Sequence, residues 1–275
     1  MNLPEVAEMA TSSLYNEYGG YLEKALQLRT SPIAIKFLAK EEDVPPQAVR
    51  PKRDRGMHLA VCQAFAMVRR QKLTLAMFKD DHWCWAPLIG YGLVKCDGEE
   101  PGFHEICRFL MMENAEAAKR HLATVFPRLD RGRYAGFVCG PLITAGFEPD
   151  LALIYSNTAQ LRHMLLAVKY KCGSLVTSQF DPIDSCVYSV VPVLLGAGYR
   201  ITLPDPGEYE RAMAEEGEII FSVPKDKLPE LIEGLRHFEE NGQGYTKFVP
   251  QLAPDFPRPP FYNELYRQWG LETTK

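Results

Sequence analysis

Short runs of consecutive apolar residues, bounded by turn residues, alternate with segments of helical pattern through the middle of this chain. Residues 134–139 and 151–155 are two such runs. Unbroken apolar character over so short a length is typical of strands that are buried on both faces. Strands of this kind need helices above and below them, so the pattern predicts an α/β fold in which a mixed β-sheet is covered by helices.

The same reading of periodicity and turn signals assigns the rest of the chain. Strands are predicted at 32–38, 73–78, 134–139, 151–155, 174–178, 199–203 and 218–223, and helices at 1–28, 57–71, 104–112, 113–126, 157–170 and 225–239. Asn157 and Gln160 form a capping-box pattern at one helix start. Asp181, followed by proline, predicts another helix start, whereas 41–56 is expected to be a loop and 83–94 gives a mixed signal.

The length of 275 residues fits one large α/β domain, and the composition changes beyond residue 247. Residues 248–260 are rich in proline and cannot form a regular helix, and a short aromatic helix is predicted at 261–269. We therefore expect one domain over 1–247 and a Pro-rich aromatic extension over 248–275. Because the aromatic side chains need a surface to cover, the extension is expected to pack on protein and to favour a homodimer or other homo-oligomer.

Charge and hydropathy exclude several classes of partner. The net charge is −4 and the isoelectric point is about 5.9, which argues against nucleic-acid binding through a basic face. No apolar run approaches the length of a membrane span, so no membrane partner is expected. Residues 1–15 carry Glu5 and Glu8 and lack the basic start and apolar block of a signal peptide. A cytoplasmic, reducing location is the expectation.

The chain has seven cysteines, at positions 62, 84, 96, 107, 139, 172 and 186. In a reducing compartment these are expected to be thiols or metal ligands rather than disulfides. The sequence has no C-x-x-C pair, so zinc ribbons and ferredoxin-type runs are not indicated, and any metal centre would be assembled by the fold. The alternative for each cysteine is a place in the core, where it acts as a small hydrophobic residue.

Two cysteines have unusual neighbours. Cys62 follows His58 by one predicted helical turn, a spacing that lets both side chains face one point. Cys84 lies between Trp83 and Trp85, whose indoles would shield a cofactor or a thiolate from water. An aromatic core cluster is the alternative for this second segment.

A third cysteine, Cys186, lies just after the helix start predicted at Asp181. Exposed backbone N–H groups in a first helical turn lower the pKa of a thiol, although Asp184 opposes this effect. We therefore predict that Cys62, Cys84 and Cys186, with Cys139 or His58 as further candidates, hold a metal centre. If they do, their sulfur atoms must lie roughly 4 to 7 Å apart in the fold.

Basic residues suggest a second kind of site. Arg53 and Arg55 belong to a basic string at 50–55 that could bind a phosphate-bearing ligand, with a solvated loop as the alternative. The phosphate-binding loops of nucleotide-dependent proteins are not found, and neither is the G-x-S-x-G elbow of α/β-hydrolases. Nucleotide binding through the standard loops is therefore not expected.

Several segments together resemble a known family. They are residues 31–36, Cys62 with Gln63, residues 148–154 with Gln160, Cys186, residues 198–200 and residues 219–224. As a set, and over about residues 21–235, they resemble domain-of-unknown-function family 169. The resemblance implies an intracellular α/β protein and supplies no reaction. It also implies cysteine at positions 62 and 186, which sets these two above the other five.

The leading hypothesis from the sequence is an oxidoreductase-type or cofactor-handling protein that holds an iron–sulfur cluster or another thiophilic metal through dispersed cysteines. Two alternatives remain open. One is a non-catalytic module that binds a small anionic or aromatic ligand with the basic string and the tryptophan pair. The other is a metal-free enzyme with Cys186 as nucleophile, activated by a histidine.

Overall fold

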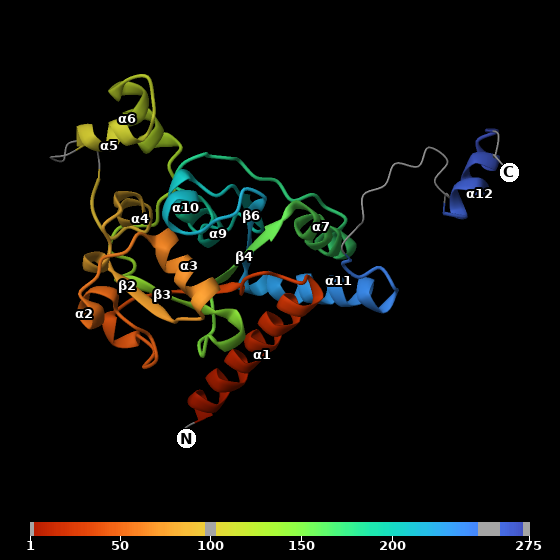
Figure 1. Ribbon diagram of the computed structural model, residues 1–275, viewed down its shortest axis with the longest axis horizontal. Coiled ribbons are helices and arrows are strands. Elements are labelled where there is room, and N and C mark those ends of the chain that lie inside the picture. Colours follow the sequence, from red (N-terminus) through yellow and green to blue (C-terminus); the bar gives the residue numbers. More distant parts are fainter. Residues whose placement is uncertain (1–2, 97–102, 247–258, 272–275) are drawn as a thin grey trace. The chain divides into compact units, whose positions relative to one another are not determined.

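The computed structural model describes residues 3–96, 103–246 and 259–271 (Figure 1). The chain divides into two compact units, Met1–Tyr245 and Thr246–Lys275. The first contains a six-stranded sheet in the order β2-β3-β1-β4-β6-β5. Its strands are β1 Ile33–Leu38, β2 Leu75–Phe78, β3 Gly136–Pro141, β4 Leu151–Asn157, β5 Arg200–Thr202 and β6 Glu218–Pro224.

The predicted α/β class, with a sheet covered by helices, is confirmed. The ladders between the six strands are antiparallel, and parallel pairing among the described residues is confined to the isolated bridges Val49–Leu75 and Leu59–His82. The helices of the first unit are α1 Leu3–Ala25, α2 Pro51–Arg55, α3 Val61–Gln71, α4 Trp85–Gly90, α5 Phe103–Phe109, α6 Ala115–Thr124, α7 Thr158–Cys172, α8 Ser185–Tyr188, α9 Val191–Leu194, α10 Pro206–Arg211 and α11 Leu228–Glu240.

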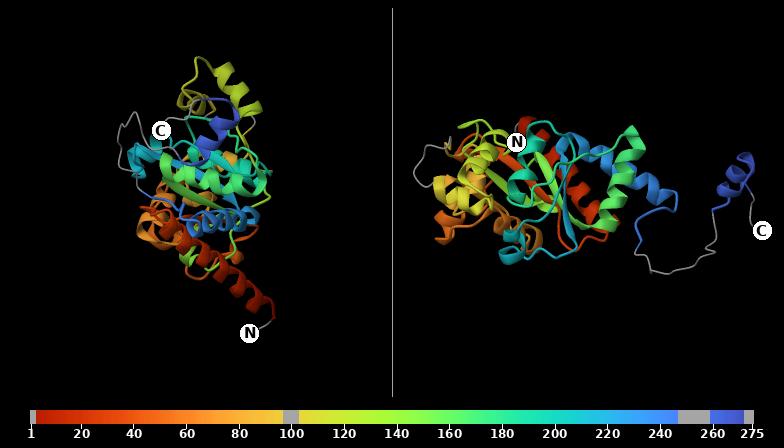
Figure 2. Two further views of the ribbon diagram at one scale, coloured as in Figure 1. Left: turned by 90° about the vertical axis from the view of Figure 1, so that its right-hand side faces the viewer. Right: turned by 90° about the horizontal axis from the view of Figure 1, so that it is seen from above.

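Both faces of the sheet are covered by apolar side chains, as its continuous apolar strands require. Along β1, Ile33, Ile35 and Phe37 enter a core shared with α3, α4 and α8. Ala34 and Leu38 point the other way, into a core shared with α1, α7 and α11. Figures 1 and 2 show α1, in red, meeting the blue α11 on this second side. The candidate site lies on the first side.

The structure corrects several predicted boundaries. Residues 174–178 form no strand; Leu175 is 80% exposed, so these residues lie outside the sheet despite their apolar character. The expected loop at 41–56 contains α2, which starts at Pro51, a favoured first helical residue. The helix predicted from Asp181 begins instead at Ser185. In contrast, the capping box of Asn157 and Gln160 is confirmed by hydrogen bonds of 2.9 and 2.8 Å.

The second unit contains α12, Phe261–Gln268, which confirms the predicted aromatic helix. The proline-rich stretch at 248–258 lies outside the described residues. The packing of the extension and the homo-oligomer therefore stay predictions. Over the described part of the chain, no helix combines the length and the apolar character that crossing a membrane requires.

Candidate functional site

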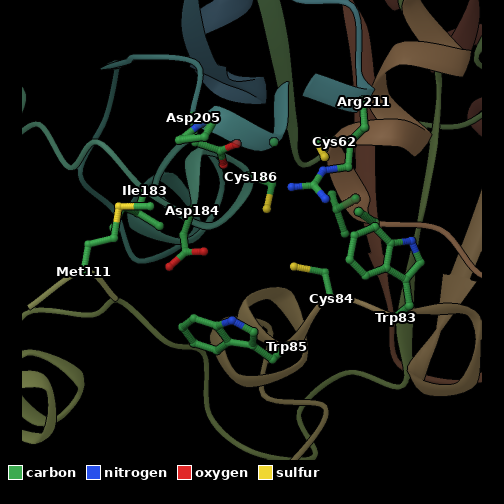
Figure 3. Close-up of a pocket in the computed structure, with 14 residues that line it drawn as sticks. Cys62, Trp83, Cys84, Trp85, Met111, Ile183, Asp184, Cys186, Asp205 and Arg211 are labelled. Atoms are coloured by element: carbon green, nitrogen blue, oxygen red, sulfur yellow. The ribbon is translucent and has the colours of Figure 1, made fainter. Parts of the chain in front are cut away.

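A pocket of about 380 Å³ opens on the α3, α8 and α10 side of the sheet (Figure 3). Cys62, Cys84 and Cys186 all line it, together with Trp83 and Trp85. Figure 3 shows the sulfur atoms of Cys84 and Cys186 turned toward the same space, with Cys62 near Arg211 and the two indoles on either side of Cys84. The fold thus brings together three cysteines that are far apart in sequence.

Backbone pairing places Cys62 next to Cys84. The N–H of Leu59 donates to the carbonyl of Asp81 at 2.9 Å, and the N–H of Trp83 donates to the carbonyl of Leu59 at 3.3 Å. These two bonds hold the segment before α3 parallel to the segment before α4. Only a few residues separate each paired segment from its cysteine. Cys62 and Cys84 therefore lie close together and both line the pocket.

The side chain of Gln63 connects the start of α3 to the wall of the pocket. Its Oε1 accepts hydrogen bonds from the backbone N–H of Ala60 at 3.0 Å and from the indole N–H of Trp83 at 3.1 Å. The first bond satisfies an N–H left open at the start of a helix. The second helps to fix the orientation of an indole that is 49% exposed.

A buried carboxylate stabilises the turn that leads to Cys84. Asp81 is fully buried and accepts hydrogen bonds from the backbone N–H groups of Lys52 and Phe78, at 2.9 Å each, and from Nε of Arg50 at 3.0 Å. A buried charge with three donors is satisfied rather than available for reaction. Asp81 therefore has a structural role.

Cys186 is the second residue of α8, whose position is set by its neighbours. Asp184, immediately before α8, has φ of 60°, a left-handed conformation that is uncommon for a non-glycine residue and that concentrates at functional sites. The backbone N–H and hydroxyl of Ser185 donate to Asp205 at 2.8 and 2.9 Å. On the other side, the hydroxyl of Tyr91 donates to the carbonyl of Cys186 at 2.8 Å.

The three thiols and the Asp184 carboxyl group of the pocket have raised pKa values. Burial raises the pKa of all three thiols, and the carboxylate of Asp205 raises the pKa of each further. Burial also raises the pKa of Asp184 to about 8. Without a cation these groups stay protonated at neutral pH, whereas a bound metal ion reverses the balance and takes up thiolates directly.

The separation of these groups limits what the site can bind as it stands. Within residues 3–96, 103–246 and 259–271, no three His, Cys, Asp or Glu side chains are placed to hold one metal ion together. Three thiolates on a single tetrahedral ion would lie only about 3.8 Å apart. The described side chains therefore form no preformed cage for one ion.

Other residues predicted for the site lie away from the pocket. Cys139 is on the interior strand β3 and is fully buried. It therefore packs in the core as a small hydrophobic residue, the alternative to a metal ligand. His58 is exposed and precedes α3, which begins at Val61, so the expected one-turn spacing from Cys62 on a shared helix is wrong. Arg53 and Arg55 are exposed on α2, where Arg53 pairs with Asp54 at 2.8 Å. None of these residues lines the pocket.

Helix α10 brings acidic and basic residues to the site that were not among the predicted site residues. Asp205 and Arg211 both line the pocket, and Glu208 lies buried behind it. Asp205 accepts from the backbone N–H of Glu208 at 3.0 Å and so caps α10. The signal was present, because Asp205 followed by a proline and an acid is a helix-start pattern of the kind recognised elsewhere in the chain.

Fold and site together define an α/β protein with a buried, cysteine-lined and tryptophan-walled pocket. A comparison with family models shows that the chain belongs to the uncharacterised ArCR family, domain of unknown function 169, whose model matches residues 21–234. An uncharacterized protein of Methanocaldococcus jannaschii is 23% identical over 217 residues, covering 78% of this chain and 91% of the relative. No solved structure matches the chain.

Proposed function

We propose that the pocket binds an iron–sulfur cluster, or another thiophilic centre of several metal atoms, through Cys62, Cys84 and Cys186, and that the protein is an oxidoreductase or cofactor-handling protein. The observation that carries this proposal is that three thiols from three separate segments line one pocket. Burial alone would scatter cysteines through the core, as it does Cys107 and Cys139.

The number of thiols bears on the kind of centre. Iron–sulfur clusters are usually held by four cysteines, and catalytic metal sites commonly combine three protein ligands with one exchangeable position. Three thiolates here would leave one position facing the pocket. A substrate atom, or the carboxylate of Asp184, would fill it, and a centre with an exchangeable ligand suits chemistry on a substrate.

The walls of the pocket suit a redox centre. Trp83 and Trp85 line the pocket beside Cys84, and Cys62 and Cys186 are only 6% and 5% exposed, so a cluster bound to these two cysteines would be largely shielded from water. Exposure to solvent and hydrogen bonds to sulfur are the main means by which a protein sets a cluster's reduction potential. We place this chemistry in the reducing cytoplasm and in a homo-oligomer, as the sequence predicts.

The metal-free nucleophile has less support. No histidine is among the described residues that line the pocket, so Cys186 lacks the base that would activate it. Burial raises the pKa of Cys186, whereas a nucleophilic cysteine needs a lowered pKa.

Metal analysis of the protein purified without oxygen tests the proposal. We expect iron and acid-labile sulfide in comparable amounts, and visible absorption that bleaches on reduction. Protein that carries no iron, sulfide or zinc, even after anaerobic reconstitution with iron and sulfide, would contradict the proposal.

A further inference from the structure

Arg211 is the one basic side chain among the described residues that line the cysteine pocket. It ends α10, and its guanidinium carbon lies 5.2 Å from the ring centroid of Trp83. A cation held over an indole keeps a defined position while its N–H groups remain available at the ring edge. Figure 3 shows the guanidinium at the pocket, on the side opposite Trp85.

Among the described residues, the ion pair of Arg211 is a weak one. Its ion pair is with the adjacent Glu210 at 3.4 Å, and that side chain is 68% exposed, so the pair contributes little. The nearby carboxylate of Asp205 accepts hydrogen bonds from Ser185 and from the backbone of Glu208. A guanidinium has five N–H donors, which leaves capacity for a bound anion.

Gly207 allows the guanidinium to lie where it does. A Cβ at this position would come within 3.1 Å of Nη2 and 3.2 Å of Nε of Arg211. Gly207 itself lines the pocket, so any side chain there would press on the guanidinium and occupy pocket volume. The absence of a side chain thus shapes both the anion-binding group and the space in front of it.

The rest of the pocket is suited to a ligand that is mainly apolar and carries no more than one negative charge. Trp83, Trp85 and Ile183 supply apolar walls, and a volume of about 380 Å³ is within the range of small-molecule sites. Asp184 and Asp205 lie in the same wall. Because Arg211 is the one basic group among the described lining residues, a second negative charge on a ligand would meet no further cation, so a monoanion is favoured over a dianion such as phosphate.

We infer that the pocket binds a small planar monocarboxylic acid, with its carboxylate on Arg211 and its apolar body against the apolar walls of the pocket. The inference rests on the proposed function in taking this pocket as the place where the metal centre meets its substrate. Arg211 is then a substrate-binding residue, and an aromatic or unsaturated acid is the substrate class.

Benzoate and its neutral analogue benzamide are the probes. Their binding is measured by calorimetry and by quenching of tryptophan fluorescence, since Trp83 and Trp85 line the pocket. We expect benzoate to bind the wild-type protein more tightly than benzamide. Arg211→Gln should weaken benzoate binding about tenfold or more, because it removes a charge-assisted hydrogen bond, and should leave benzamide binding unchanged.

Arg236→Gln is the matched control, because Arg236 also lies 5.2 Å from an aromatic centroid, that of Tyr21, and pairs with Glu17 at 2.8 Å. It should leave benzoate binding unchanged. Gly207→Ala should weaken benzoate binding while its circular dichroism spectrum stays that of the wild type. Equal affinity for benzoate and benzamide, stronger competition by inorganic phosphate than by benzoate, no benzoate binding, or equal losses in both arginine variants would overturn the inference.

Metal content measured on the same samples separates the two proposals. Protein that takes up no iron, sulfide or zinc even after anaerobic reconstitution, yet binds benzoate through Arg211, would sustain this inference and contradict the metal proposal. Iron-loaded protein that binds benzoate and benzamide equally would support the metal proposal and contradict this inference.

Discussion

The hydroxyl of Tyr91 donates a 2.8 Å hydrogen bond to the backbone carbonyl of Cys186. Tyr91 is the C-cap residue that follows α4, the helix that begins at Trp85, and it is only 1% exposed. The bond therefore connects the helix that carries one tryptophan wall to the helix that carries a predicted metal ligand. The ring of Tyr91 packs against Phe37 and Phe137, so side chains of the sheet hold its hydroxyl in place.

Tyr91→Phe should destabilise the protein by about 1 kcal/mol, because it keeps the ring and removes one buried hydrogen bond. The free energy of unfolding in urea gives the measurement. Tyr209→Phe is the control, since Tyr209 is 41% exposed, and it should change stability very little. Equal effects of the two substitutions would show that the bond to Cys186 does not contribute.

Gly90 sets how closely α4 approaches α8. A Cβ there would come within 2.6 Å of Cγ1 of Val187. Gly90→Ala should cost about 1 to 3 kcal/mol, because two well-packed helices must separate. Gly217→Ala is the control, as a Cβ at Gly217 meets nothing within 4 Å. Urea unfolding of both variants tests this, and a Gly90→Ala protein as stable as the control would count against close packing at this point.

Glu208 should make stability depend on pH. Burial raises its pKa from 4.5 to about 8, and it accepts from the hydroxyls of Tyr155 at 2.8 Å and Ser185 at 3.2 Å. Because the folded pKa is above the unfolded value, proton binding favours the folded state. This contribution is complete below the unfolded pKa and is lost as pH rises through about 8.

Glu208→Gln should accordingly reduce the loss of stability between about pH 5 and pH 9, relative to the wild type. Urea midpoints at the two pH values test it. Glu210→Gln, at an exposed position on the same helix, should follow the wild-type profile. Parallel profiles for all three proteins would mean that Glu208 does not titrate in this range.

Much of the fold follows from local pattern. Four strands, β1, β3, β4 and β6, are apolar runs bounded by turns. Because a strand buried on both faces is apolar along its whole length, such runs can be predicted from the sequence. Residues 174–178 show the limit of this reasoning, because Leu175 is 80% exposed and the segment joins no strand ladder. The antiparallel order of the ladders could not be read from periodicity, since strand direction depends on connections across the whole chain.

The candidate site was only partly predictable. Cys84 was marked by its tryptophan neighbours, and Cys62 was marked by a helical spacing from His58 that the structure does not keep. Their meeting depends on the bridge between Leu59 and His82, a long-range pairing without a local signal. Arg211 was not identified at all, because a single arginine at a helix end becomes distinctive only when the fold brings it over Trp83.

The central claim is tested most directly by the metal and sulfide content of four cysteine variants purified without oxygen. Cys62→Ser, Cys84→Ser and Cys186→Ser should each lose most of the bound metal, since each removes one of three ligands. Cys107→Ser, which changes a buried cysteine outside the pocket, should retain the wild-type content. Wild-type metal content in all three pocket variants, or the same loss in Cys107→Ser, would contradict the account.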